Sequence, residues 1–131
     1  MKVFILEDDQ NRVEWFLENL ETEDIDLTEK AQEGIDWLRE RKYDVIFLDH
    51  DLGGRVYVSS DEFNTGYTVA KMIHETDNVD TPVIIHSWNS NGAKNMKDAL
   101  TSNGVVNQYH PFMSLEFKMV VNNVNQQGKP E

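Results

Sequence analysis

Short apolar runs alternate along the chain with segments in which apolar residues recur at helical spacing. The apolar runs predict five strands, at residues 2–6, 25–28, 43–48, 82–87 and 105–109. Between the first two runs, Val13, Phe16, Leu17 and Leu20 lie three or four residues apart, which predicts a helix with one apolar face. Strict alternation of this kind is typical of an α/β fold, in which helices cover both faces of a doubly wound parallel sheet.

The domain organisation follows from the length and from one irregular stretch. A chain of 131 residues suits one domain, which we expect at residues 1–124. Residues 52–65 interrupt the pattern with two glycines and a short apolar patch, so we predict a long loop or a hairpin insertion there. Residues 125–131 are polar and predict a frayed tail.

Charge and composition argue against several classes of function. The 24 acidic and 12 basic side chains give a net charge of -12, which repels long duplex nucleic acid. The absence of cysteine excludes disulfides and thiolate metal sites and suits a reducing compartment. No run approaches the roughly 18 apolar residues of a membrane helix. We therefore expect a soluble, cytoplasmic protein that does not act at membranes, and a small phosphorylated ligand held by a metal remains compatible with the charge.

Polar residues follow the carboxyl ends of four predicted strands. They are Glu7, Asp8 and Asp9; Asp49, His50 and Asp51; His86, Ser87, Trp88 and Asn89; and His110. In a doubly wound sheet, ligands bind at this edge, where the strand order reverses. Two carboxylates about 4 Å apart repel by about 4 kcal/mol at an effective dielectric constant of 20, so a cluster of acids needs a cation or altered protonation. Oxygen ligands from Asp8, Asp9, Asp49 and Asp51 suit Mg²⁺ or Mn²⁺, and a histidine ligand would favour Mn²⁺ or Zn²⁺.

The alternation of side chains along a strand leaves several orientations open. Glu7 either joins the other acids of the cluster or is turned away from them by this alternation. His50 and Asp51 cannot both face one ion without a turn; we expect Asp51 to face the site, and His50 either faces it or packs against the third helix. If Ser87 faces the site, His86 points sideways and is either a hydrogen-bonded core histidine or, after a bulge, part of the site.

The segment after the fourth strand also offers phosphate-binding groups. Ser87 and Asn89 are candidates for hydrogen bonds to phosphate oxygens. A helix beginning at Asn91 would direct its N–H groups at the site, an arrangement that favours phosphate, and Asn91 is equally a good helix cap. Trp88 either stacks on a base or packs against the protein and plugs the site.

The motifs, in their order along the chain, resemble those of the receiver domain of two-component response regulators. Residues 5–9 resemble the acidic pair that binds Mg²⁺, residues 45–49 the strand with the phosphoacceptor aspartate, and residues 82–87 the strand ending in the switch Ser/Thr. Residues 109–112, Tyr-His-Pro-Phe, stand in place of the family's Lys-Pro-Phe. The resemblance implies the strand order 2-1-3-4-5 of a receiver or flavodoxin-like fold, a Mg²⁺ site and phosphorylation of Asp49.

Departures from the receiver pattern indicate a subgroup. His110 replaces a lysine, Trp88 stands where receivers keep a small residue, and the segment between Asp49 and Gly66 is longer than usual. Leu-Asp-His-Asp-Leu-Gly-Gly at 48–54, with His-Ser-x-Asn-x-x-Gly-Ala-x-x-Met at 86–96, resembles the cyclic-phosphate processing receivers. This resemblance implies a reaction on a cyclic phosphate or a related phosphoester.

The sequence leaves three hypotheses open for the function of the protein. In the first, the protein is a metal-dependent phosphoesterase that acts on a small phosphate compound or an RNA end, with Asp49 at the metal, Ser87 beside it and His110 or His86 as general acid or base. In the second, it is a stand-alone receiver that is phosphorylated on Asp49 and signals to a protein partner. In the third, it is a degenerate receiver that binds a protein or a nucleotide and does no chemistry.

Overall fold

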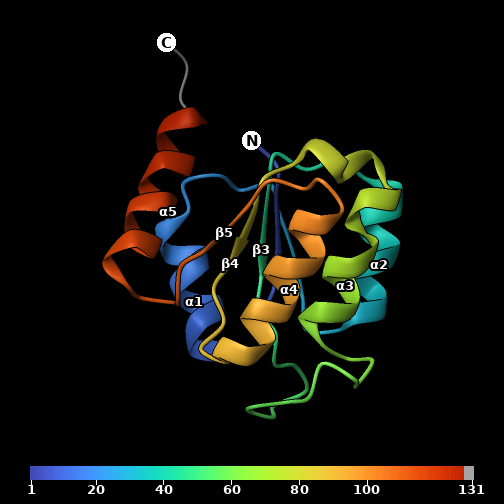
Figure 1. The fold of residues 1–131 in the computed structure, drawn as a ribbon. Coiled ribbons are helices and arrows are strands. Elements are labelled where there is room, and N and C mark those ends of the chain that lie inside the picture. The colour runs from blue at the N-terminus through green and yellow to red at the C-terminus, as the bar shows by residue number, and fades with distance from the viewer. Residues whose placement is uncertain (129–131) are drawn as a thin grey trace.

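The computed structural model describes residues 1–128, which form one parallel sheet between two layers of helices (Figure 1). The five strands are β1 (Val3–Leu6), β2 (Ile25–Thr28), β3 (Val45–Leu48), β4 (Val83–Ile85) and β5 (Asn107–Tyr109). They lie in the order β2-β1-β3-β4-β5, and every neighbouring pair is parallel. The predicted fold class and strand order are therefore confirmed.

The helices form two layers, one on each face of the sheet. They are α1 (Gln10–Asn19), α2 (Ala31–Glu40), α3 (Gly66–Met72), α4 (Ser90–Ser102) and α5 (Leu115–Gln127), with short 3-10 helices η1 (Ile73–Glu75) and η2 (Asp77–Asp80) between α3 and β4. Helices α1 and α5 cover one face, and α2, α3 and α4 cover the other (Figure 1). None of these helices is long and apolar enough to span a membrane.

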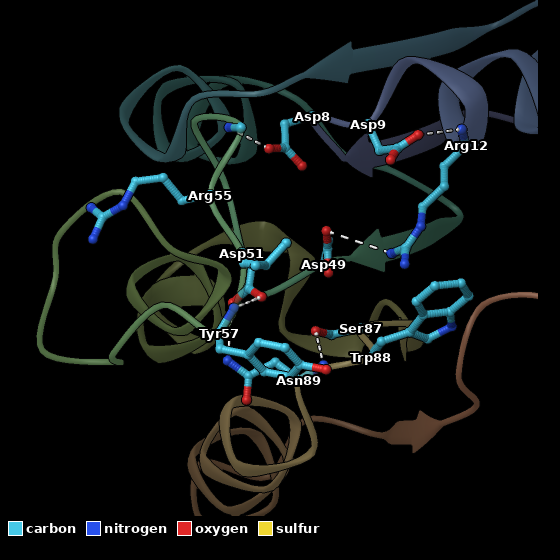
Figure 2. Close-up of a pocket in the computed structure, with 12 residues that line it drawn as sticks. Asp8, Asp9, Arg12, Asp49, Asp51, Arg55, Tyr57, Ser87, Trp88 and Asn89 are labelled. Carbon is cyan, nitrogen blue, oxygen red and sulfur yellow. Dashed lines mark hydrogen bonds and ion pairs between the residues drawn. The ribbon is translucent and has the colours of Figure 1, made fainter.

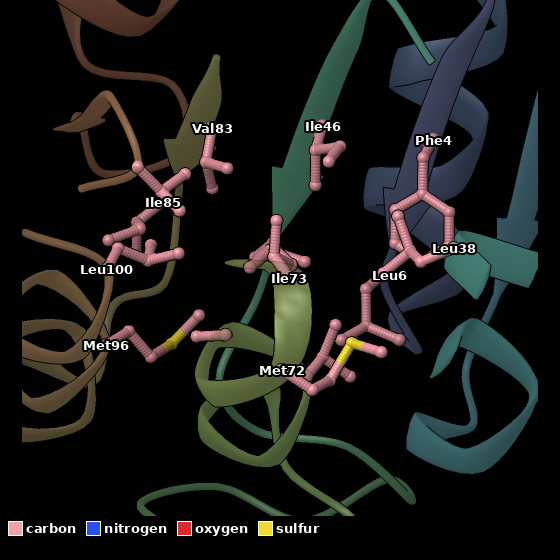
Figure 3. Packing of buried hydrophobic residues seen from close by; sticks show 14 of the residues in the cluster. Phe4, Leu6, Leu38, Ile46, Met72, Ile73, Val83, Ile85, Met96 and Leu100 are labelled. Atoms are coloured by element: carbon pink, nitrogen blue, oxygen red, sulfur yellow. The ribbon is translucent and has the colours of Figure 1, made fainter. Parts of the chain in front are cut away.

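Burial on both faces explains the unbroken apolar sequence of the central strands, since every residue of β1 and β3 is buried. Phe4 and Leu6 pack with Ile46 beneath α2, α3 and α4 (Figure 3). Val3 and Ile5 point the opposite way, toward α1 and α5. The same alternation continues past the ends of the strands, and it decides which polar side chains meet there.

Several predicted boundaries need correction. Strand β5 begins at Asn107 rather than at 105. Helix α4 begins at Ser90 and is capped by Asn89, whose side chain accepts a hydrogen bond from the Gly92 N–H, so Asn91 is not the cap. Helix α5 continues to Gln127, beyond the predicted domain end at 124; residues 129–131 of the predicted tail lie outside the described residues.

Residues 52–64 form a loop between β3 and α3, called here the β3–α3 loop. No hairpin strand forms within these residues; instead, Asp51 and Thr65 make one isolated antiparallel bridge at the base of the loop. Gly53 and Gly54 have φ angles of 73° and 74°, a backbone conformation that glycine adopts without steric cost. Val58 is buried, so the loop is tied to the domain at its middle as well as at its ends.

Candidate functional site

A cavity of about 220 Å³ lies at the carboxyl ends of β1, β3 and β4, beneath the β3–α3 loop (Figure 2). Its lining residues come from the strand ends, the first turn of α1 and the loop. They are Asp8, Asp9, Arg12, Asp49, Asp51, Gly54, Arg55, Val56, Tyr57, Ser87, Trp88 and Asn89. The structure thus brings most of the predicted site residues to one cavity. It also adds residues that the sequence does not indicate, among them Arg12.

Asp49 is the central carboxylate of this cavity. It is almost completely buried, its Oδ1 accepts a hydrogen bond from the His50 N–H at 2.8 Å, and its Oδ2 lies 3.8 Å from the Arg12 guanidinium. Burial raises the pKa of Asp49 to about 7, and the neighbouring Glu7 carboxylate adds to the rise. Asp49 therefore sits where a cation or a proton is needed.

Glu7 is turned toward Asp49, which is the inward one of the two orientations that the sequence leaves open. In the register of the sheet, Ile5 pairs with Phe47, so Glu7 and Asp49 continue the same row on the same face. The Glu7 carboxylate is fully buried and accepts hydrogen bonds from the N–H groups of Asp8 and Asp9, both at 3.0 Å. Burial raises its pKa to about 7, although the Asp9 N–H and the Arg12 charge oppose the rise.

His86 completes this row, because Phe47 pairs with Ile84 in the register. Its Nε2 lies 2.9 Å from a Glu7 oxygen, and its ring packs against a cage of phenylalanines, Phe16, Phe47, Phe112 and Phe117. Burial lowers the pKa of His86 to about 4, so the imidazole is neutral at physiological pH. His86 is a core histidine that supports Glu7, and it does not line the cavity.

Asp8 and Asp9 have different surroundings. Asp8 lines the cavity, and its Oδ2 accepts a hydrogen bond from the Gly54 N–H at 2.6 Å, which links β1 to the β3–α3 loop. Asp9 is exposed and caps α1, where its Oδ1 accepts the N–H groups of Asn11 and Arg12. Among the described residues, the second oxygen of each carboxylate accepts no hydrogen bond, so both oxygens are free to bind a cation.

Asp51 and His50 hold the loop. Asp51 lines the cavity, but its carboxylate already accepts hydrogen bonds from Tyr57 N, Val58 N and Asn89 Nδ2 at 2.6 to 3.1 Å. Burial alone would raise the pKa of Asp51. The hydrogen bonds from Asn89, His50 and the two backbone N–H groups outweigh burial, so the pKa lies below its ordinary value. These bonds make Asp51 an anchor of the loop, and its role as a metal ligand stays a prediction.

The ring of His50 points toward α4 rather than toward the third helix, and it does not line the cavity. It is fully buried, with Nδ1 2.9 Å from Asp51 Oδ1 and Nε2 2.8 Å from the Ser60 hydroxyl. A Cβ at Gly92 would lie 2.4 Å from the His50 ring, so only glycine fits at this point of α4. His50 thus connects the β3–α3 loop to α4, through its contact with the Ser60 hydroxyl and its packing against Gly92.

Ser87 and Asn89 lie beside Asp49 on the cavity wall. The Ser87 Oγ accepts a hydrogen bond from the Asn89 N–H at 3.0 Å, so the hydroxyl proton remains available to a ligand. The side chain of Asn89 is occupied: its Nδ2 donates to Asp51 and to the Val58 carbonyl, and its Oδ1 caps α4. Of these two predicted phosphate-binding residues, Ser87 has the free donor.

Trp88 does not plug the cavity. It is 61% exposed, its Nε1 donates to the Phe112 carbonyl at 3.0 Å, and its ring lies 4.4 Å from the Arg12 guanidinium. The Phe112 ring lies 5.0 Å from the same guanidinium, so two aromatic rings contact Arg12. Trp88 therefore fixes the position of Arg12.

His110 lies outside the cavity. Its ring is half-exposed, and its Nε2 lies 2.9 Å from the Gln108 side chain. The cation beside Asp49 and Glu7 is instead Arg12, at 3.8 Å and 3.6 Å. Arginine keeps its charge at any physiological pH, so this cavity has a fixed cation rather than a titrating imidazole.

A family model described as "Cyclic-phosphate processing Receiver domain" matches residues 1–102, which is more than half of the chain. The chain belongs to this family. No curated protein matches this cyclic-phosphate processing receiver domain significantly.

Solved structures of receiver domains are similar over almost the whole chain. The receiver domain of a Francisella response regulator is 24% identical, with 98% of each chain covered and a TM-score of 0.63. The HemR receiver domain from Leptospira biflexa is 19% identical, with 99% and 98% covered and a TM-score of 0.68. The receiver domain of a sensor histidine kinase from Pseudomonas aeruginosa, with a magnesium ion coordinated in its active site cleft, is 17% identical, with 95% and 97% covered and a TM-score of 0.65. At these identities, the similarity shows the fold.

The donor groups of the receiver domain fit a divalent cation. Ligand atoms of Glu7, Asp49 and His86 lie within 4.8 Å of one another. Because burial raises the pKa of both carboxyl groups to about 7, a cation would take the place of protons in this cluster. The His86 Nε2 is already bonded to Glu7, so the oxygens of Asp49 and Asp8, which face the cavity, are the better ligands for Mg²⁺ or Mn²⁺.

Sequence reasoning missed Arg12, Arg55 and Tyr57 in the cavity lining. Arg12 could have been found, because it follows Asp9 by three residues and so lies on the same side of the first turn of α1. Arg55 and Tyr57 could not, because their positions depend on an irregular loop whose conformation is set by Asp51 and Gly54.

Proposed function

We propose that this receiver domain binds Mg²⁺ or Mn²⁺ and hydrolyses a cyclic phosphate or a related phosphoester in the cavity beneath the β3–α3 loop. The observation that carries the proposal is the pairing of opposite charges there: the Asp49 carboxylate and the Arg12 guanidinium lie 3.8 Å apart in a cavity of about 220 Å³. The carboxylate suits a cation, and the guanidinium suits a phosphate oxygen. A phosphate and a metal ion can therefore be held in contact.

The residues have separate tasks in this proposal. Asp49 and Asp8 hold the cation, which when bound neutralises the phosphate charge and polarises its oxygens. Arg12, fixed by Trp88, binds a phosphate oxygen, and the free Ser87 hydroxyl donates to another.

The reaction needs one water molecule. The water oxygen forms a bond to phosphorus while one P–O bond of the ring breaks, and the departing oxygen takes up a proton as the water loses one. No histidine lies among the residues that line the cavity, so we assign the proton exchange to water within it.

The test is an incubation of the purified protein with Mg²⁺ or Mn²⁺ and a panel of phosphates. The panel contains 3′,5′-cyclic nucleotides, 2′,3′-cyclic nucleotides and RNA with a 2′,3′-cyclic phosphate end, and ³¹P NMR follows ring opening. We expect turnover that requires the metal, is abolished in Asp49→Asn and is reduced in Arg12→Met. Asp98→Asn is the matched control, because Asp98 is an exposed acid on α4 that pairs with Lys94. Absence of turnover with either metal on every substrate would overturn the catalytic proposal.

A second candidate function is phosphorylation of Asp49 itself. It is favoured by the position of Trp88, which turns to Arg12 and to the Phe112 carbonyl and leaves Asp49 in the cavity lining. Acetyl phosphate and Mg²⁺ should then add one phosphoryl group to the intact protein but none to Asp49→Asn, as measured by mass spectrometry. An unchanged mass of the intact protein would exclude this function under those conditions.

A further inference from the structure

Tyr57 is the one aromatic residue that lines two adjoining cavities of the described structure. One is the cavity of Asp49 and Arg12; the other, of about 260 Å³, lies between the β3–α3 loop and the first turns of α4. The two cavities share Tyr57 and Asn89. A ligand with its phosphate beside Arg12 would therefore meet the Tyr57 ring with the next part of its structure.

The Tyr57 ring is presented to solvent at a conformational cost. Its side chain is 78% exposed, and its backbone has a φ of 54°, a left-handed conformation that is unfavourable for an aromatic residue. Two hydrogen bonds to the Asp51 carboxylate, from Tyr57 N at 2.6 Å and Val58 N at 3.1 Å, hold this conformation. The turn thus keeps a large flat surface in water at the mouth of the cavity.

The two aromatic residues of the cavity have different surroundings. The Trp88 indole has the Arg12 guanidinium against its ring and a hydrogen bond to the Phe112 carbonyl. Tyr57 has no ring or cation partner among the described residues. In the view of Figure 2, Tyr57 lies on the loop side of the cavity, and Trp88 lies on the side of Arg12. Tyr57 is the ring that remains free for a ligand.

The second cavity is lined by amides and hydroxyls. Asn91 and Asn95 are exposed on α4, and Ser59 and Ser60 face them from the loop. The Asn95 Nδ2 donates to the Ser60 Oγ at 2.9 Å, which leaves its Oδ1 as an acceptor. Side-chain amides that both donate and accept are the groups that pair with the edges of nucleobases.

From these observations we infer that the ligand is a nucleoside phosphate, whose base stacks on Tyr57 with its edge toward Asn91 and Asn95. The inference rests on the proposed function, because it places the phosphate beside Arg12. Sugar and glycerol phosphates carry no flat ring and would leave Tyr57 and the second cavity without contact. Stacking on an aromatic side chain typically improves affinity by about tenfold or more per base.

The test compares two probes that differ in the base. Isothermal titration calorimetry with Mg²⁺ present measures the binding of a nucleoside monophosphate and of ribose 5-phosphate. We expect the intact protein to prefer the nucleoside monophosphate by about tenfold. Tyr57→Asn should remove most of this preference, because asparagine tolerates the left-handed backbone but offers no ring. Tyr57→Phe should retain the preference.

Phe63→Ala is the matched control, because Phe63 is an exposed aromatic residue of the same loop that lines neither cavity. Equal affinity of the two probes, or an equal loss for both in Tyr57→Asn, would overturn the inference. Binding of the nucleoside monophosphate with the expected preference but without turnover of any cyclic phosphate would overturn only the catalytic proposal. Failure of both probes to bind would overturn the inference, whereas the catalytic proposal stands or falls with turnover of the cyclic phosphates.

Discussion

In the absence of divalent cations, raising the pH should destabilise this protein, because Glu7 and Asp49 must lose protons inside the fold. Glu7 has an ordinary pKa of 4.5 and a pKa of about 7 in the folded protein, and that of Asp49 rises from 3.8 to about 7. The folded state therefore binds these protons more tightly than the unfolded chain. Their contribution to stability is complete below the unfolded pKa values and is lost as the pH rises through about 7.

His86 acts in the opposite direction at lower pH. Its pKa falls from 6.5 to about 4 on folding, so its contribution is complete above 6.5 and is lost as the pH falls through about 4. Below pH 6.5 the carboxyl groups and the imidazole therefore oppose one another. Above pH 6.5 the imidazole of the unfolded chain loses its remaining charge, which offsets a small part of the fall, so Glu7 and Asp49 dominate the slope.

The size of the effect follows from the pKa values in that upper window. For one carboxyl group with a pKa of about 7, the free energy of unfolding falls by about 1 kcal/mol between roughly pH 6.5 and pH 8. Glu7 and Asp49 influence one another's titration, so the pair should lose about 1 to 2 kcal/mol. This is a measurable part of the 5–15 kcal/mol typical of a folded domain.

Urea unfolding in EDTA, followed by tryptophan fluorescence at several pH values in this window, measures the slope. Glu7→Gln should flatten it, whereas Glu18→Gln, at an exposed position of α1, should leave it unchanged. Millimolar Mg²⁺ should raise the stability most at the upper end of the window, where the carboxylates have lost their protons. A flat profile for the intact protein, or an unchanged slope in Glu7→Gln, would refute the reasoning.

Three further predictions concern the loop and the cation. Gly92→Ala should lower the free energy of unfolding by about 1 to 3 kcal/mol in urea titrations, because the new Cβ would collide with the buried His50 ring. Asp51→Ala should speed limited proteolysis within residues 52–64, since the Tyr57 and Val58 N–H groups lose their acceptor; an unchanged cleavage rate would contradict its role as an anchor. Arg12→Lys should weaken phosphate binding in calorimetry by about tenfold, because a lysine cannot reproduce the planar stack on the indole ring or two-point hydrogen bonding; full retention of affinity would show that charge alone suffices.

The sequence was sufficient for the sheet because its central strands are buried on both faces, which requires unbroken apolar runs. The site was only partly predictable. Asp49 and Ser87 lie in the cavity, as their place after strands indicates, but the inward orientation of Glu7 depends on the pairing of β1 with β3. Once strands lie side by side, residues at matching positions share a face, so the row of Glu7, Asp49 and His86 follows from register and not from any one strand.

The β3–α3 loop was the least predictable part, because its conformation depends on contacts outside it. Asp51 binds its backbone, Asp8 binds Gly54, and the buried Val58 ties it down. No periodic pattern records such contacts, so the sequence is equally compatible with a hairpin. His110 was assigned to the site from its place in a motif, but its ring pairs with Gln108 and does not line the cavity.

The bridge between Asp51 and Thr65 has a consequence for the connectivity of the chain. Because the bridge closes the loop at its base, the peptide could be opened within residues 52–64 while every strand pair keeps its register. Met1 and Gly128 are neighbours, with only 3.6 Å between the Met1 Cβ and a Cβ built on Gly128. In a variant shortened to Gly128, a short linker to Met1 would give a circular permutant whose new ends emerge beside the cavity, so that a reporter fused there would lie next to a bound ligand.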